Sequence, residues 1–268
     1  MPEVAQAVRD MHRMETLSRM NSPVHRLHPV AKILTTAVFL VALLSNGRHE
    51  VGRLLPFLLY PVLIASLADL PWKPFLLRVL AVEPLVLGIG AFSPLLESSR
   101  TILFGVPVST GWLTFASLAI RTTLCVLVAL QLVATTGMER ILTGLRRLGL
   151  PAVMVLQIAL TYRFLTVLAG EIGRLLTAYR LRAPAHRGIH PAAWGSLAGQ
   201  LLLRSFDRAN RVWQAMKLRG YEGHVPLPPG LRMRQGDWFW LAAWAGWFTL
   251  SRTMDLPAML GMLATGGR

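Results

Sequence analysis

Apolar runs separated by short polar breaks occupy most of the chain, and five of them approach the roughly 20 residues that a helix needs to cross a bilayer. Four of these runs precede residue 136, and the fifth lies near the C-terminus. The predicted crossings are Val30–Ser45, Leu54–Leu70, Phe75–Phe92, Trp112–Thr135 and Trp238–Thr253. Pro56 and Pro61 should kink the second crossing, which membrane helices tolerate. The pattern predicts an all-α integral membrane helical bundle of about five transmembrane helices.

The pattern changes between the fourth and fifth crossings, where basic and apolar positions share the same helices. In Leu201–Gly223, apolar residues recur with the spacing of an amphipathic helix, and Gly220 stands where a helix C-cap favours glycine. The basic face of this stretch carries Arg204, Arg208, Arg211, Ala215 and Arg219. We expect two long helices, from residue 153 to about Arg182 and from Ala192 to Arg219, joined by a turn at 184–191. They are predicted to form an amphipathic hairpin at the boundary between membrane and water.

Charge indicates on which side of the membrane this hairpin lies. Of 268 residues, 53% are hydrophobic and 15% are charged, against about 25% charged in soluble domains. The formal net charge is +15, and residues 136–236 contain 15 Lys and Arg against 4 Asp and Glu. Because basic segments stay in the cytoplasm, this region is predicted to be cytoplasmic. Anionic lipid headgroups and acidic protein surfaces fit it better as partners than nucleic acid does.

The predicted organisation follows from the distribution of charge together with the number of crossings that precede the basic region. With the N-terminus inside, four crossings return the chain to the cytoplasm at residue 136, where the basic region begins. We therefore expect a cytoplasmic segment at 1–29, transmembrane helices 1–4 at 30–135, a basic cytoplasmic region of long helices at 136–236, and a last transmembrane helix with its tail at 237–268. The apolar stretch Val153–Ala169 is expected to pack on the bundle, because a crossing there would place Arg182 and Arg219 outside.

Histidine and cysteine offer little support for a metal site. His186 and His190 are four residues apart, but Pro184 and Pro191 disfavour the single regular helix on which such a pair could ligate a metal. His25 and His28 precede the first crossing and, like the other pair, fit interfacial polar positions or helix caps. The single cysteine, Cys125, excludes an internal disulfide and a thiolate-cluster site. We predict no metal ligands and no cofactor.

Two charged residues lie within predicted crossings, Glu83 in the third and Arg121 in the fourth. Such groups cost several kcal/mol in a bilayer unless they are paired or hydrated. They could line a substrate or proton path, or form an internal ion pair that sets the helix register. One acid and one base do not make a relay chain, so we favour a structural Glu83–Arg121 ion pair.

No phosphate-binding G-x-x-x-x-G-K-[ST] loop, H-E-x-x-H pair or G-x-S-x-G elbow is present. The sequence therefore offers no residues that support an enzymatic function. What remains are two arginine segments near predicted helix ends, AYRLRA at 178–183 and AMKLRGYEG at 215–223. A guanidinium at a helix tip presents a planar fork of donors that suits a carboxylate on a partner protein.

Three segments carry a resemblance to a known family. SPVHRLHPVAKIL at 22–34, TTGMERILTGLRRLGLP at 135–151 and QLLLRSFDRANRVWQAMKLRGYEG at 200–223 resemble the T component of energy-coupling-factor (ECF) transporters, most closely the CbiQ type of cobalt and nickel uptake systems. The similarity runs from about residue 15 to 250. It implies a multi-pass scaffold of the bacterial inner membrane whose cytoplasmic coupling helices dock on two ABC ATPase subunits. Its membrane part would grip a substrate-binding subunit, CbiM-like and accompanied by a small CbiN-like subunit.

The resemblance also implies docking residues, since each coupling helix of the family bears an Ala-Arg-Gly-like signature. The first signature arginine falls on Arg182, in Leu-Arg-Ala, with Arg180 as the alternative. The second falls on Arg219, in Leu-Arg-Gly, with Ala215 and Gly220 beside it. Relatives often read Asp-Pro-Arg where this chain has His28-Pro29-Val30.

Three functions are left open by the sequence. The first is a non-catalytic coupling subunit of an ATP-driven importer, as the resemblance implies. The second is a self-contained divalent-metal permease that uses histidines and Glu83. The third is a structural membrane anchor whose basic hairpin binds anionic lipid, for which Arg and Lys would serve equally.

Overall fold

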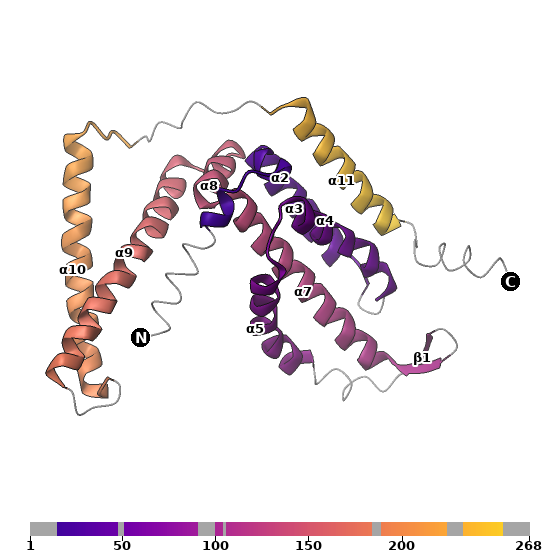
Figure 1. The fold of residues 1–268 in the computed structure, drawn as a ribbon, viewed down its shortest axis with the longest axis horizontal. Coiled ribbons are helices and arrows are strands. Elements are labelled where there is room, and N and C mark those ends of the chain that lie inside the picture. The colour runs from indigo at the N-terminus through magenta and orange to yellow at the C-terminus, as the bar shows by residue number, and fades with distance from the viewer. Residues whose placement is uncertain are drawn as a thin grey trace. The chain divides into compact units, whose positions relative to one another are not determined.

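The computed structural model describes residues 15–47, 51–90, 100–103, 106–183, 189–223 and 233–253. Most of the predicted N-terminal segment, the turn at 184–188, the Pro-rich linker at 224–232 and the C-terminal tail at 254–268 lie outside these residues. The described residues are almost entirely helical, as the sequence predicts (Figure 1). One short antiparallel pair lies between the third and fourth predicted crossings: β1 (Arg100–Leu103) pairs with β2 (Val106–Ser109).

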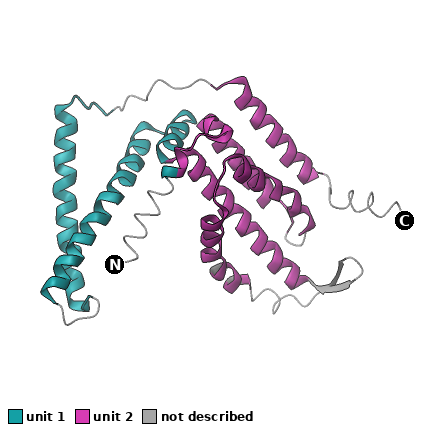
Figure 2. Cartoon of the chain, viewed as in Figure 1, with its two compact units in different colours: residues 1–16, 138–230 teal, residues 17–137, 231–268 magenta. Residues whose placement is uncertain are grey.

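The chain divides into two compact units (Figure 2). Unit 1 comprises Met1–Thr16 and Met138–Gly230, and unit 2 comprises Leu17–Gly137 and Leu231–Arg268. Most of the basic region, residues 138–230, therefore falls in unit 1, and the five predicted crossings fall in unit 2.

Unit 2 contains the helices of the predicted bundle. Four predicted crossings correspond to single helices: α3 (Pro29–Leu44), α5 (Trp72–Gly90), α7 (Thr110–Thr136) and α11 (Gln235–Thr253). A single turn, α2 (Pro23–Arg26), precedes α3. Prolines stand at the first positions of α2 and α3, where their missing N–H groups need no partner.

The second predicted crossing is not one kinked helix. It is divided into a 3₁₀ segment, η1 (Gly52–Leu58), and a nine-residue helix, α4 (Leu59–Leu67). Pro56 lies inside η1, and Pro61 lies in the first turn of α4, where a helix does not need the N–H group. Both proline carbonyls accept hydrogen bonds from side chains of other helices. Pro56 O accepts from Trp247 Nε1 at 3.4 Å, and Pro61 O accepts from Gln131 Nε2 at 2.8 Å.

An aromatic cluster forms the core of unit 2. Phe39, Phe57 and Phe248 are completely buried, and Tyr60 and Trp244 are nearly so. Phe39 and Phe248 meet edge to face at 5.3 Å between ring centroids, and Tyr60 meets Trp244 at 4.7 Å. Such pairs add about 0.5–1.5 kcal/mol each beyond the area that they bury. The cluster joins α3, η1, α4 and α11, so residues separated by some 200 positions form one core.

The described residues of unit 1 include the helices α8 (Met138–Arg147), α9 (Ala152–Arg182) and α10 (Pro191–Leu218). α9 and α10 match the two predicted long helices to within a few residues. The left-handed Gly149, with φ +103°, follows α8. Leu150 N–H bonds back to Leu145 O at 3.2 Å, which is a glycine C-cap of the Schellman type.

Among the described helices, α7 and α9 are long and apolar enough to cross a membrane, by length and composition. The apolar helices Pro29–Leu44 and Gly52–Leu67 are shorter. The number of crossings and the expectation that α9 does not cross remain predictions.

Candidate functional site at the helix tips

The C-terminal tip of α10 carries Arg219 on a well-defined helix end. Gly220 adopts φ +78°, and Tyr221 N–H bonds to Met216 O at 3.0 Å, which closes a Schellman cap. Arg219 is the C-cap residue and is exposed, as are Ala215 and Gly220. Glycine is needed here because a Cβ disfavours the left-handed backbone. The cap therefore ends the helix immediately after Arg219.

Aromatic side chains support this tip from the previous turn. The Trp213 and Tyr221 rings meet edge to face with 6.0 Å between centroids, and Lys217 Nζ lies 5.2 Å from the centre of the Trp213 ring. Contact between the residue after the capping glycine and the last turn commonly accompanies this motif. Tyr221 is thus fixed next to Arg219, so the arginine leaves the helix from an ordered backbone.

The C-terminal tip of α9 carries the other two predicted docking arginines, Arg180 and Arg182, and both are exposed. They are two residues apart and so project on roughly opposite sides of the helix. Tyr179 OH accepts a bond from His190 N–H at 3.1 Å, which ties this tip to the start of α10. The structure presents both arginines, so the choice between them remains open.

The two tips lie far apart on the hairpin. Arg182 is near the N-terminal end of α10 through the Tyr179–His190 bond, whereas Arg219 is at the opposite end. α10 has 28 residues, so at 1.5 Å per residue the tips are separated by about 40 Å along it. Both arginines stand at helix C-termini, where the helix dipole favours a positive charge.

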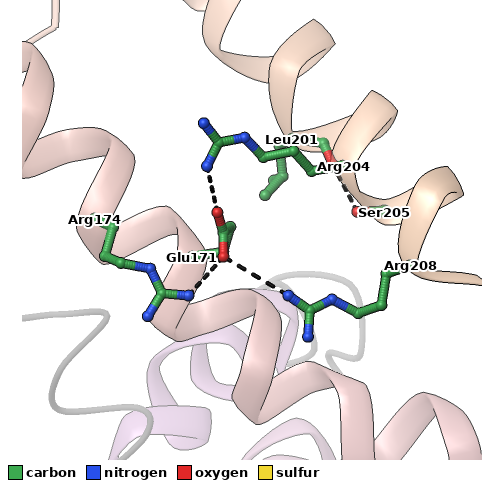
Figure 3. A network of polar contacts seen from close by, with 6 residues as sticks. All are labelled: Glu171, Arg174, Leu201, Arg204, Ser205 and Arg208. Carbon is green, nitrogen blue, oxygen red and sulfur yellow. Dashed lines mark hydrogen bonds and ion pairs between the residues drawn. The ribbon is translucent and has the colours of Figure 1, made fainter. Parts of the chain in front are cut away.

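A charged cluster lies where α9 and α10 cross, and sequence reasoning did not find it (Figure 3). Glu171 of α9 is about nine-tenths buried, and three arginines surround its carboxylate. Arg174 donates to Oε2 at 2.6 Å, Arg204 donates to Oε1 from the facing helix, and Arg208 Nη2 lies 3.9 Å from Oε2. The only signal in the sequence was an isolated acid between apolar neighbours of a basic hairpin.

The predicted Glu83–Arg121 ion pair is not formed. Glu83 accepts a hydrogen bond from Thr123 Oγ1, whereas Arg121 Nη2 donates to the carbonyls of Asn46 and Gly47 at 3.0 and 2.6 Å. Positions 121 and 123 point about 200° apart around α7. Because Thr123 faces Glu83, Arg121 faces away from it. Arg121 instead satisfies carbonyls beyond the end of α3, a favourable place for a cation.

The described histidines make local hydrogen bonds. His28 Nδ1 accepts from Val30 N–H at the start of α3, and His190 Nδ1 accepts from Ala192 N–H at the start of α10. Buried His25 bonds through Nδ1 to Ser22 Oγ at 2.7 Å. Among the residues that the structure describes, His, Cys, Asp and Glu form no group of three suited to a metal ion. His186 lies outside those residues.

Comparison with known proteins places this sequence in a family. The sequence model of the family described as "Cobalt transport protein", CbiQ, matches residues 20–228. The energy-coupling factor transporter transmembrane protein EcfT of Bacillus subtilis is 28% identical over 226 residues, 75% of this chain and 82% of the relative. The nickel permease LarQ of Lactiplantibacillus plantarum is 28% identical over 199 residues, covering 71% and 72%.

The cobalt transport protein CbiQ of Rhodobacter capsulatus is 34% identical over 113 residues, 41% of this chain and 46% of the relative. The matched family region includes α2 to α5, α7, both tips and the crossing of α9 and α10. The resemblance seen in the sequence is thereby confirmed: the chain belongs to the CbiQ family and is a membrane component of a transport system.

Proposed function

We propose that this chain is the non-catalytic coupling subunit of an ECF-type ABC importer, which passes the movement of two ATPase subunits to a membrane subunit that binds the substrate. The observation that carries the proposal is the pair of exposed arginine tips about 40 Å apart on one hairpin. A single small partner cannot contact both tips, whereas two separate subunits can each take one. The names of the relatives, an energy-coupling factor transmembrane protein and cobalt and nickel transport proteins, agree with it.

The proposed mechanism is mechanical. ATP binding draws the two ATPases together and displaces the docked tips, and the long helices carry this displacement because packed helices shift as units. The free energy of coupling comes from contacts that differ between the two ATPase states. The proposed substrate is cobalt or nickel ion, held by a CbiM-like subunit with its small CbiN-like companion.

The test is to remove the tips one at a time. Arg182→Ala and Arg219→Ala should each weaken ATPase binding by about 2–5 kcal/mol if the guanidinium pairs with a buried carboxylate, which is at least tenfold. Lysine should not restore binding, because the fork geometry is lost. Co-purification of the ATPases and ATP-driven metal uptake in vesicles measure the effect, and Arg180→Ala in the same series shows which arginine serves the first tip.

Arg211→Ala is the matched control, since it removes an exposed arginine of α10 about two turns before Arg219. Normal ATPase binding by an Arg182→Ala, Arg219→Ala double variant would refute the proposal. Uptake that needs no ATPase would instead indicate a self-contained permease, and full rescue by lysine would indicate a lipid-binding anchor.

A further inference from the structure

The charged cluster around Glu171 joins α9 and α10 far from their turn. Glu171 lies 11 residues before Arg182, and Arg204 lies 13 residues after Pro191. At 1.5 Å per residue, the crossing is about 17–20 Å from the end of the hairpin. Arg219 is a further 15 residues, or about 22 Å, beyond Arg204. The cluster therefore lies between the two arginine tips.

Apolar packing does little to hold the helices together near this point. α10 has no buried residue among those described, and Leu202, Leu203 and Phe206, which flank Arg204, are 57, 66 and 59% exposed. The described polar links between the helices are the Tyr179–His190 bond at the turn and the contacts of Glu171 with Arg204 and Arg208. If the contacts at the crossing were lost, the hairpin would be joined mainly at its turn.

The three arginines have different parts in this arrangement (Figure 3). Arg174 lies three residues along the same helix and fixes the orientation of the Glu171 carboxylate. Arg204 takes the other oxygen and makes the direct hydrogen bond between the helices, while Arg208 adds a longer ion pair. One oxygen of the buried carboxylate thus accepts the hydrogen bond that orients Glu171, and the other accepts the hydrogen bond that joins the two helices. Both bonds are strengthened by the opposite charges of donor and acceptor.

We infer that Glu171 is a positioning residue for coupling: it pins α9 to α10 at their crossing, so that a displacement of the Arg219 tip is passed from α10 to α9. The inference rests on the proposed coupling function. A tip that is pushed while the pin is intact transmits its displacement to the whole hairpin. Without the pin, the same push opens the angle between the helices, and part of the motion never reaches the rest of the chain.

The test measures metal uptake per ATP hydrolysed by the complete transporter in vesicles. Arg204→Gln is the main variant, because it removes the joining bond and leaves Glu171 paired with Arg174 and Arg208. We expect the ATPases to co-purify normally and ATP hydrolysis to continue, while uptake per ATP falls at least fivefold. Glu171→Gln should lower uptake per ATP by the same factor, and Arg208→Gln should lower it by a smaller factor. The double variant Glu171→Gln, Arg204→Gln should lower uptake per ATP no further than either single change, because both changes remove the same contact.

Two further variants separate positioning from general destabilisation. Asp207→Asn removes an exposed acid from α10 next to Arg208 and should leave the ratio of uptake to ATP unchanged. The charge swap Glu171→Arg with Arg204→Glu should recover part of the loss of Glu171→Gln. A merely unstable protein lowers uptake and ATP hydrolysis together, so the ratio distinguishes the two causes.

The link between α9 and α10 can also be measured directly, as a distance in the complete chain. Spin labels at the exposed positions 153 and 218, introduced as Val153→Cys and Leu218→Cys in a Cys125→Ser background, should give one narrow distance distribution that Arg204→Gln broadens. An unchanged uptake ratio and an unchanged distribution in Arg204→Gln overturn the inference. If the unaltered chain binds no ATPase, the proposed function fails instead, and the distance measurement still decides whether Glu171 pins the hairpin.

Discussion

Gly220 shows how one residue sets the direction of a side chain that is proposed to dock a partner. Its φ of +78° ends α10 immediately after Arg219, and the Tyr221–Met216 hydrogen bond depends on that turn. An added Cβ at Gly220 would meet nothing within 4 Å. The position is therefore constrained by its backbone conformation alone, and the constraint can be tested without a steric clash.

Gly220→Ala should destabilise the cap by about 1–2 kcal/mol, because the left-handed conformation costs that much for a residue with a Cβ. Hydrogen exchange of the Tyr221 amide should then quicken by roughly 5–30-fold (1.4 kcal/mol per factor of ten), and ATPase co-purification should fall with it. Gly199→Ala is the control, because this glycine is inside α10 with equal space around it. There alanine favours the helix by about 1 kcal/mol. Unchanged exchange at Tyr221 would contradict the expected strain.

At the scale of elements, a buried carboxylate connects α3 and α11, two of the elements that form the aromatic core of unit 2. Asp237, in the first turn of α11, accepts His28 N–H at 2.9 Å through Oδ1 and Arg234 N–H at 2.8 Å through Oδ2. Its position at a helix N-terminus is favourable for a negative charge. The start of α3 and the start of α11 are thus held by one side chain.

Asp237→Ala should lower the free energy of unfolding by about 2–3 kcal/mol, because it leaves buried N–H groups without their charged acceptor. Tryptophan fluorescence during thermal unfolding in detergent measures this, since Trp244 belongs to the same core. Asp207→Ala, at an exposed position on α10, should leave the midpoint unchanged. Equal midpoints for the two variants would show that the Asp237 contacts add nothing.

At the scale of the whole molecule, orientation in the membrane decides whether the arginine tips can reach cytoplasmic ATPases. Residues 136–236 carry the basic excess, and α9 is both a candidate span by composition and the helix that bears Arg182. Positive charge favours the cytoplasmic side. We therefore expect both tips inside and the end of α11 outside.

Cysteine labelling in intact cells tests this orientation, and Cys125→Ser provides a background without cysteine. A membrane-impermeant maleimide should label Thr253→Cys from outside. It should label Leu181→Cys and Leu218→Cys only after permeabilisation, although both side chains are exposed. Labelling of Leu181→Cys from outside would show that α9 crosses the membrane and would remove the docking proposal.

Much of the helical organisation was predictable because its signals are local. The apolar runs and the 3.6-residue period located α3, α5, α7 and α11, and Gly220 marked the end of α10. The division of the second crossing into η1 and α4 was missed, because Pro56 and Pro61 fit either a kinked helix or a restarted one. Which of these forms depends on the partners of their carbonyls, Trp247 and Gln131, which come from other helices.

The candidate site, like the fold, was predictable only where its signals are local. The arginine tips follow from helix ends and composition, and they are exposed as expected. Glu171 was missed and Glu83 was given the wrong partner, since periodicity defines the faces of one helix and not which face meets a neighbour. The relation of Glu83 to Thr123 instead of Arg121 is decided by the rotation of α7 against α5.

By itself, the sequence determined most of the helices, their approximate ends, the basic hairpin and the family, because each depends on residues close together in the chain or on motifs read in order. Only the tertiary structure decided which polar groups meet. Arg204 comes 33 residues after Glu171, and Asp237 comes 209 residues after His28. The physical reason is that a buried polar group must be satisfied by whichever element packs against it, and that packing is set by the fold as a whole.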